Sequence, residues 1–493
     1  MKKPIDIGSR RELFVDDFMF TGTGNAKFVM HNPEPKELAV KRDTIGDDHA
    51  TSYYSIVFDG SKYSLFYTGH GFGLSQGKWP HQHICRAESE DGIHWVKPNY
   101  GLYEFKGTKE NNIVYLLEND LLDNFFVFYD PNPNCPANEK FKALLERVLE
   151  DGNPVLNAAT SEDGIHWTDR GIVIYKGTFD SLNTCYFDEE TETYYAYVRT
   201  WEDHLPGRNI GETRTEDMNV DTATRARSIV RLESKDFFNW SEPEPLYYGT
   251  CLDYQMYTNN IMPYYRAKHI IIGFPTRYYA RPWRRLFKEI PSSSVRKFTE
   301  EDTRTGFIPM TDGLFMSSRD GLNFKRYDST PFFPSGPEGK GNWVYGDAYP
   351  AYGMIETPSD RPLEPNQISM LVPDNAYNGL RRHVIRLDGF VSLHAETEPE
   401  VILTKPFTFK GNRLEFNYKT TVAGGFKVEL LDEYRNPYPG FEMDKCDEMF
   451  GDTVARDISW NEQFDVSSLE GKTVYMRIKM YECDLFSFRF YNK

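Results

Sequence analysis

Long apolar segments are missing from this sequence of 493 residues. No run of about 18 apolar residues occurs, so we expect no transmembrane helix. Lys2 and Lys3 are followed by Pro4 and not by an apolar stretch, so a secretory signal peptide is not expected either. For the sequence as written we therefore expect a cytoplasmic protein, or the trimmed form of an exported one.

Cysteine is scarce, with six residues scattered along the chain. No Cys-x-x-Cys pair is present, which argues against a cysteine-based zinc site. A chain of this length can bury a large core and does not need a disulfide framework. From the residues alone we expect neither a metal centre nor a cofactor.

Positive charge is also in deficit. The chain has 57 basic and 74 acidic residues, a net charge of −17, and this excludes nucleic acid and anionic membranes as partners of the whole chain. One basic island stands out, with four arginines in residues 277–285. It could meet an anionic glycan, such as a uronate or a sulfate ester, or it could clamp the acidic residues 300–302 or a neighbouring subunit.

Aromatic residues, in contrast, make up 15% of the chain, and a short motif recurs among them. Residues 89–95 and 161–167 share the identical heptapeptide Ser-Glu-Asp-Gly-Ile-His-Trp. Weaker copies occupy residues 234–240 and 318–324, and a degenerate fifth copy occupies residues 386–390. The aspartates of successive copies are 72, 73, 84 and 68 residues apart. Such a period indicates an array of similar structural units.

The chemistry of the motif is that of a scaffold. An aspartate can accept hydrogen bonds from its own backbone two residues on, and glycine tolerates positive φ, so Asp-Gly predicts a turn. The Trp or Phe that follows offers a large apolar surface for packing. We therefore expect these motifs, their histidines included, to be structural.

Between the motifs lie pairs of β-branched and aromatic runs joined by turns, for example residues 53–58 with 63–67 and 184–187 with 194–198. Helical periodicity is rare. Units of about 70 residues built from antiparallel strands predict an all-β fold, a five-bladed β-propeller with a short N-terminal lead-in over residues 1–395. The alternating pattern after residue 396 predicts a C-terminal β-sandwich over residues 396–493.

In a propeller the innermost strands converge, so acids that precede these strands would meet at one end of the central channel. The candidates are Asp47 or Asp48, which the pattern does not distinguish, and Asp180, Asp253 and Asp347. The second unit offers Asn111-Asn112 in place of an acid. Each candidate has a structural alternative, such as capping a turn or bonding a strand start.

The order of these acids resembles the five-bladed glycoside hydrolases of families 32, 43 and 68. Residues 12–17 (Glu-Leu-Phe-Val-Asp-Asp) and 341–347 (Gly-Asn-Trp-Val-Tyr-Gly-Asp) look most like a set of uncharacterised bacterial fructosidase-like propellers. The sequence lacks those families' Asn-Asp-Pro-Asn-Gly, Arg-Asp-Pro and Glu-Cys motifs. The resemblance implies a nucleophile or base at Asp47 or Asp48, a transition-state stabiliser at Asp180 and an acid at Asp253. It is also compatible with a single structural ion in the channel.

Further side chains near these acids are candidate substrate contacts, because guanidinium, imidazole and aromatic groups bind sugars: His49, Trp79, Arg199, Arg231, Tyr257 and Trp343. For the arginines, ordinary ion pairing is the alternative. The sequence therefore predicts a carbohydrate substrate and a glycoside hydrolase that uses aspartate carboxylates. A glycoside phosphorylase and a non-catalytic glycan-binding propeller are the alternatives.

Overall fold

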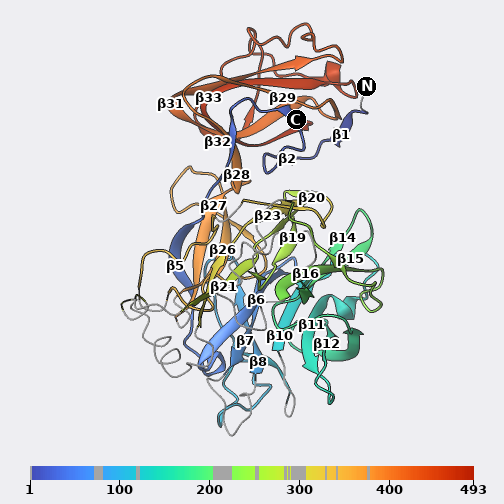
Figure 1. The fold of residues 1–493 in the computed structure, drawn as a ribbon, viewed down its shortest axis with the longest axis vertical. Helices are drawn as coiled ribbons and strands as arrows, with labels where there is room; N and C mark the ends of the chain where they lie inside the picture. The colour runs from blue at the N-terminus through green and yellow to red at the C-terminus, as the bar shows by residue number, and fades with distance from the viewer. Residues whose placement is uncertain are drawn as a thin grey trace.

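The computed structural model describes residues 3–70, 82–117, 123–203, 225–249, 255–282, 286, 289, 307–327, 330–339, 342–374 and 378–493. Their regular structure is β-strand with three short 3-10 turns, Ile45–Asp47 (η1), Ala137–Glu139 (η2) and Ser467–Leu469 (η7), so the predicted all-β class is confirmed. Among the helices of these residues none is long and apolar enough to cross a membrane. Figure 1 shows two bodies, a larger one and a smaller one beside it that holds both termini.

The larger body, which we call the propeller-like body, contains five four-stranded sheets within the described residues. The first sheet is β6–β7–β8–β9 (Ala50–Phe58, Tyr63–His70, Gln82–Ser89, Ile113–Leu116). The second is β10–β11–β12–β13 (Asp123–Tyr129, Phe141–Val148, Pro154–Ser161, Thr168–Ile174). The third is β14–β15–β16–β17 (Thr184–Asp188, Thr193–Asp203, Arg225–Ser234, Glu244–Pro245).

The fourth sheet is β19–β20–β23–β24 (Ile261–Tyr264, Ala267–Gly273, Met316–Ser318, Phe324–Arg326). Beside it lies a three-stranded sheet, β18–β21–β22 (Gln255–Met256, Thr276–Pro282, Phe307–Gly313). The fifth sheet is β25–β26–β27–β5 (Ile355–Thr357, Gln367–Asp374, Gly379–Arg386, Glu34–Lys41). Because β5 comes from the N-terminal part of the chain, the last sheet is completed by the first strand of this body.

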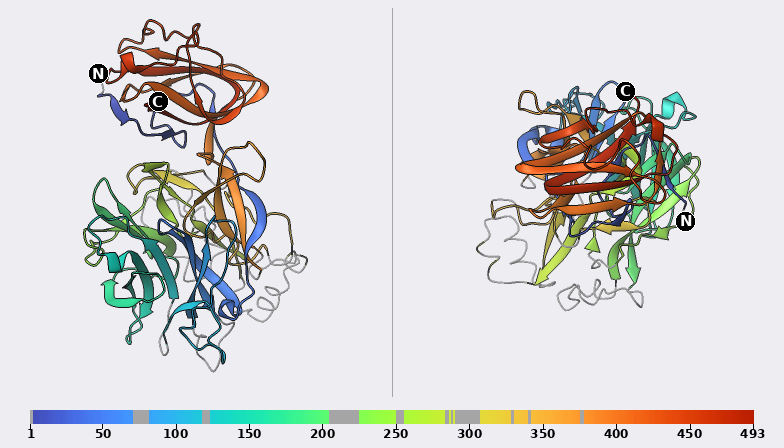
Figure 2. Two further views of the ribbon diagram at one scale, coloured as in Figure 1. Left: turned by 180° about the vertical axis from the view of Figure 1, so that it is seen from behind. Right: turned by 90° about the horizontal axis from the view of Figure 1, so that it is seen from above.

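The first and fifth sheets also meet at their inner ends. The Tyr352 amide donates to the Tyr54 carbonyl at 2.8 Å, and the Ile56 amide donates to the Tyr352 carbonyl at 2.8 Å. The segment that leads into β25 therefore lies against β6, and together with the β27–β5 pairing it closes the succession of sheets into a ring. Figure 2 shows the molecule from behind and from above, with the C-terminal body in front in the second view.

The centre of the ring is packed. The ring of Tyr352 lies edge-on to that of Phe126 on β10, with 4.8 Å between centroids, and its hydroxyl lies 3.4 Å from the Cys185 carbonyl on β14. Phe126 and Cys185 are fully buried, and Tyr352 is 8% exposed. The sequence analysis predicts a central channel with the aspartates at one end, and at the level of Tyr352 side chains from the second, third and fifth sheets meet and are buried. We therefore expect a ligand site on the axis of this ring to lie at one of its two ends.

The recurring motif is structural, as predicted. In the first copy, Asp91 Oδ1 accepts from the amides of Ile93 and His94 at 2.9 and 2.8 Å, and Oδ2 lies 2.7 Å from His94 Nδ1. Asp163, Asp236 and Asp320 accept the same pair of amide hydrogen bonds. These carboxylates are thus engaged by their own turns at the ends of the third strands.

The smaller body, which we call the C-terminal body, is built around an eight-stranded sheet. Its strands are β2 (Glu12–Leu13), β3 (Phe20–Gly22), β4 (Lys27–Met30), β28 (Val391–Ala395), β29 (Glu400–Thr404), β31 (Arg413–Leu431), β32 (Asp452–Asp457) and β33 (Tyr475–Tyr491). A further pair, β1 (Ile5–Gly8) and β30 (Phe407–Phe409), is parallel. Buried aromatic and aliphatic side chains from both ends of the chain form its core.

These pairings correct the expected division at residue 395. Residues 5–30, expected as part of the propeller, pair with C-terminal strands instead; Met30, for example, lies opposite Val391. β28 lies before the expected boundary and also belongs to the C-terminal body. The sequence pattern shows where strands occur, but pairing between segments hundreds of residues apart leaves no local signal.

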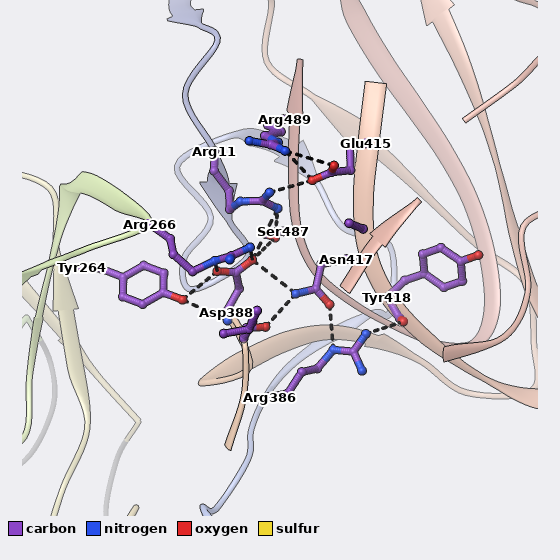
Figure 3. A network of polar contacts seen from close by, with 12 residues as sticks. Arg11, Tyr264, Arg266, Arg386, Asp388, Glu415, Asn417, Tyr418, Ser487 and Arg489 are labelled. Atoms are coloured by element: carbon purple, nitrogen blue, oxygen red, sulfur yellow. Dashed lines mark hydrogen bonds and ion pairs between the residues drawn. The ribbon is translucent and has the colours of Figure 1, made fainter. Parts of the chain in front are cut away.

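A buried polar network joins the two bodies at Asp388, the aspartate of the degenerate fifth motif (Figure 3). Its Oδ1 accepts from Tyr264 Oη at 2.7 Å and from Arg266 Nε at 2.8 Å, both in the propeller-like body. Its Oδ2 accepts from Ser487 Oγ at 2.6 Å and from Asn417 Nδ2 at 3.2 Å, both in the C-terminal body. This aspartate has therefore become the polar link between the bodies.

Candidate functional site

One group of side chains gathers where several innermost strands begin. We call it the mouth cluster, and its members are Asp180, Arg199, Arg227, Tyr257, Tyr278, Tyr345 and Tyr349. Asp180 precedes β14, Tyr257 precedes β19, and Tyr345 and Tyr349 precede β25. The arginines come from β15 and β16, and Tyr278 comes from β21. Starting from segments far apart in sequence, the fold brings these groups to one end of the ring.

The loop before β14 presents Asp180. The Asp180 amide donates to the Thr178 carbonyl and the Ser181 amide to the Phe179 carbonyl, both at 2.5 Å, which makes two consecutive tight turns. Phe179 has a φ of 39° and a fully buried ring, and Asn183 Nδ2 donates to the Phe179 carbonyl at 2.8 Å. The backbone is thereby anchored while the Asp180 side chain stays 57% exposed.

Arg199 is the partner of Asp180. Its Nη1 lies 2.8 Å from Asp180 Oδ2 and donates to the Asp180 carbonyl at 2.5 Å, and its own side chain is only 2% exposed. Burial opposes the charge of this guanidinium, but Asp180 together with Tyr257 and Tyr53 outweighs burial, so the pKa of Arg199 is raised. The arginine thus fixes where the carboxylate points.

Four tyrosine rings lie together beside this pair, and Tyr257 is the one in contact with both members. Tyr257 lies 6.0, 5.7 and 5.6 Å from Tyr278, Tyr345 and Tyr349, measured between ring centroids. Its hydroxyl lies 3.5 Å from Asp180 Oδ1. Tyr345 is 43% exposed, whereas Tyr257 and Tyr349 are largely buried. The cluster therefore offers solvent an aromatic surface beside a carboxylate, an arrangement that suits a sugar ring.

A second guanidinium lies on these rings. The Cζ of Arg227 is 4.3 Å from the Tyr278 centroid and 5.5 Å from that of Tyr257, and its Nη1 donates to Gln255 Oε1 at 2.6 Å. Burial, together with the positive charge of Arg199, lowers the pKa of Arg227. Two arginines therefore flank Tyr257, since the Arg199 Cζ lies 5.1 Å from the same ring.

Asp347 lies in the turn between Tyr345 and Tyr349. Its Oδ2 accepts from the Trp343 and Val344 amides at 2.5 and 3.2 Å, and the residue is 6% exposed. Burial raises the pKa of Asp347 to about 7, and the negative charge of Asp312 adds to the effect. A carboxyl group whose pKa lies near neutral pH can act as a general acid.

The two first-unit candidates lie in other surroundings. Asp47 is 1% exposed; its Oδ2 accepts from the amides of Asp43 and Thr44 and from Lys97 Nζ, and its Oδ1 from Tyr67 Oη. Its contacts thus lie inside the first sheet and its loops. Asp48 lies 2.5 Å from Lys106 Nζ and 3.7 Å from the exposed His49 imidazole. Neither carboxylate contacts the mouth cluster.

Arg231 also lies away from the mouth cluster. Its Nη1 donates to the Asp320 carbonyl at 2.7 Å, in the motif turn of the next sheet, and its Nη2 pairs with Glu233 at 2.8 Å. Arg86 makes the equivalent bond from the first sheet to the Asp163 carbonyl, also at 2.7 Å. Both arginines begin an Arg-x-Glu-Ser sequence, a repeat signal that identifies Arg231 as a tie between sheets.

Of the remaining candidates, Asp253 and Trp79 lie outside the described residues. Trp343 lines a cavity next to Asp347, and its Nε1 donates to the Gly336 carbonyl at 2.9 Å. The sequence analysis did not select Arg227, Tyr278, Tyr345 or Tyr349. Tyr345 and Tyr349 flank the chosen Asp347 in the sequence, a signal that a search for acids passes over, whereas no nearby candidate acid marks Arg227 or Tyr278.

Comparison with known proteins gives likenesses of fold. No protein-family model and no curated protein matches this sequence. An N-acetylgalactosamine deacetylase from F. plautii, solved with blood group B trisaccharide, has a TM-score of 0.44 and 12% identity, covering 74% of this chain and 96% of that chain. A thermostable family-43 glycoside hydrolase has a TM-score of 0.38 and 12% identity, covering 69% and 92%.

A family-32 β-fructofuranosidase from Bombyx mori has a TM-score of 0.37 and 9% identity, covering 94% of both chains. Families 32 and 43 are among those that the sequence resembles. TM-scores of this size carry no argument about activity or substrate.

Proposed function

We propose that this protein is a carbohydrate-active enzyme, a glycoside hydrolase whose site is the mouth cluster together with Asp347. In this proposal the five four-stranded sheets are the blades of a five-bladed propeller, and the C-terminal body is a β-sandwich that carries no catalytic group. The observation that supports it best is the pairing of an exposed, arginine-held carboxylate, Asp180, with a tyrosine surface at one end of the ring.

The two carboxyl groups take different roles because their surroundings differ. Glycosidic cleavage needs one group that protonates the leaving oxygen and one carboxylate that faces the anomeric carbon, directly or through water. Asp347, whose pKa is raised to about 7, donates the proton. Asp180, paired with Arg199 at 2.8 Å and open to solvent, is the carboxylate that faces the sugar. The proposed cleavage uses no cofactor.

The tyrosines and Arg199 have supporting roles. Tyr345, which is 43% exposed, provides a face on which a pyranose ring can stack, and the hydroxyl of the largely buried Tyr257 stays near Asp180. Arg199 is a positioning residue, since it acts through the carboxylate it holds. A positively charged sugar in the transition state is stabilised by the Asp180 carboxylate.

The test uses a panel of oligosaccharides and reads released product. The variants Asp180→Asn and Asp347→Asn should each lower turnover by about 100-fold or more on whichever glycan the native enzyme cleaves. Asp151→Asn changes an exposed hairpin carboxylate and should retain full turnover. Turnover that survives both site substitutions would refute the assignment, and glycan binding without any product would indicate a binding protein instead.

A second candidate is a glycoside phosphorylase, and the placement of two arginines supports it. Arg199 and Arg227 flank the Tyr257 ring at 5.1 and 5.5 Å, and guanidinium groups bind phosphate oxygens well. In that reaction inorganic phosphate would attack the anomeric carbon in place of water. Turnover that requires phosphate and yields a sugar phosphate would select the phosphorylase, and turnover in phosphate-free buffer would select the hydrolase.

A further inference from the structure

A cavity of about 390 Å³ lies beside the proposed site. It is within the size range of small-molecule sites, which begins at about 300 Å³. Its described walls come from β21, β22 and the loop before β25. The side chains on which the argument rests are Arg277, Tyr279, Arg281, Asp312 and Trp343.

The alternation of β21 separates this cavity from the mouth cluster. Successive side chains of a strand point to opposite faces. Arg277, Tyr279 and Arg281 line the cavity, whereas Tyr278, between them, packs on Tyr345 in the mouth cluster at 6.1 Å. One strand therefore contributes to both places, so a ligand in the cavity would lie next to one at the mouth.

Trp343 and Asp347 give a second connection. The Trp343 side chain lines the cavity, while its backbone amide holds the Asp347 carboxylate at 2.5 Å. The backbone of this turn is tied to β22, since Thr311 Oγ1 donates to the Asp347 carbonyl at 2.8 Å. The proposed acid and the cavity wall thus belong to the same turn.

The cavity presents guanidinium groups in an otherwise acidic protein. Asp312 fixes Arg277, accepting from its Nε at 2.8 Å and from its Nη2. Arg281 is exposed, and its Cζ lies 5.2 Å from the Tyr279 ring. Among the described lining residues, two arginines face one aspartate, in a chain with a net charge of −17. A planar guanidinium held beside aromatic rings suits a carboxylate attached to a sugar ring.

We propose that this cavity binds a uronate, a sugar unit bearing a carboxylate, whose carboxylate pairs with Arg281 and whose ring lies against Trp343. The inference rests on the proposed function, because it places the acidic unit next to the bond that the mouth cluster would cleave. It names the substrate class as an acidic glycan. A glycan that meets the protein here gains affinity from its negative charge.

The test is calorimetric titration of the full-length protein with uronate oligosaccharides from pectin, alginate and glucuronoxylan. Each is paired with its carboxyl-reduced, neutral counterpart. At least one acidic oligosaccharide should bind ten-fold or more tightly than its counterpart, and added NaCl should reduce this preference. If no acidic member binds more tightly than its neutral counterpart, the proposal is wrong.

The variant Arg281→Gln should remove the preference, and Arg281→Lys should retain part of it because the charge remains. Arg361→Gln changes an arginine that is 72% exposed elsewhere on the propeller-like body and should leave the preference intact. A preference that persists in Arg281→Gln would also overturn the proposal.

These results separate the two proposals. Cleavage of a neutral glycan that depends on Asp180 but not on Arg281 would leave the hydrolase standing and remove the uronate site. Arg281-dependent binding of an acidic glycan without cleavage would do the reverse.

Discussion

The hydroxyl of Tyr264 donates a 2.7 Å hydrogen bond to Asp388, and this bond joins the innermost strand of the fourth sheet to the segment that enters the C-terminal body (Figure 3). Asp388 is fully buried. Burial alone would raise its pKa, but the charges of Arg11 and Arg266 hold the pKa below its ordinary value. The junction of the two bodies is therefore built around one buried charge.

Removing the Asp388 carboxylate should destabilise the folded protein strongly. Asp388→Ala leaves Arg11 and Arg266 without their shared carboxylate, and loss of one partner from a buried ionic network costs about 3–5 kcal/mol. We predict that the free energy of unfolding, measured with urea, falls by that amount. Asp320→Ala, which removes the carboxylate of a turn that is partly open to solvent, should cost about 1 kcal/mol and serves as the comparison. Equal effects of the two variants would contradict this account of the junction.

Arg231 and Arg199 should behave differently when each is changed to Gln. Arg231→Gln loses the bond to the Asp320 carbonyl and should lower the free energy of unfolding by about 1–3 kcal/mol, with turnover unchanged. Arg199→Gln releases Asp180 and should lower turnover at least ten-fold. The measurements are urea unfolding and turnover for both variants. If the folded Arg231→Gln variant loses turnover, Arg231 contributes to the active site and its assignment as a purely structural residue is wrong.

Asp347 makes stability depend on pH. Its pKa is about 7 in the folded protein, against about 3.9 for an unperturbed aspartate, so the folded state holds the proton more tightly. Stability therefore falls as the pH rises from about 4 to about 7, by roughly 1.4 kcal/mol per pH unit at most. Asp347→Asn should flatten this part of the curve, measured as the free energy of unfolding from pH 5 to 7.5. An unchanged slope would show that Asp347 titrates normally.

Phe237 occupies a position where the other clear copies of the motif have glycine. Its φ is 72°, close to the 74°, 69° and 70° of Gly92, Gly164 and Gly321. Such a backbone costs a non-glycine residue about 1 kcal/mol, whereas the fully buried ring contributes about 3 kcal/mol or more. The burial of the ring should outweigh the backbone strain, so Phe237→Gly should lower the free energy of unfolding by about 2 kcal/mol or more. A gain in stability would show that strain dominates.

The scaffold was more predictable from the sequence than the site was. The Asp-Gly motif repeats because each third strand ends in the same local turn, and local hydrogen bonds such as those of Asp91 leave a local signal. The pairing of β4 with β28 leaves none, because the two strands lie near opposite ends of the chain. Both limits of the expected propeller domain therefore differ from the observed ones, since β4 and β28 belong to the C-terminal body.

The sequence identified candidate acids but did not show which of them are open to solvent. Asp47 and Asp180 precede innermost strands alike, but Asp47 is enclosed by Lys97 and Tyr67 whereas Asp180 reaches solvent. Which of two aspartates is enclosed depends on loops that fold back from elsewhere in the chain. The raised pKa of Asp347 likewise comes mainly from its burial in the folded protein, so the sequence around residue 347 does not predict it.

The most direct measurement of the central claim is a crystal structure of the Asp180→Asn variant with the glycan that the native enzyme cleaves. We predict a sugar ring stacked on Tyr345, with its glycosidic oxygen within hydrogen-bonding reach of residue 347 and its anomeric carbon facing residue 180. A glycan found only on the outer strands or on the C-terminal body, with the mouth cluster empty, would contradict the account.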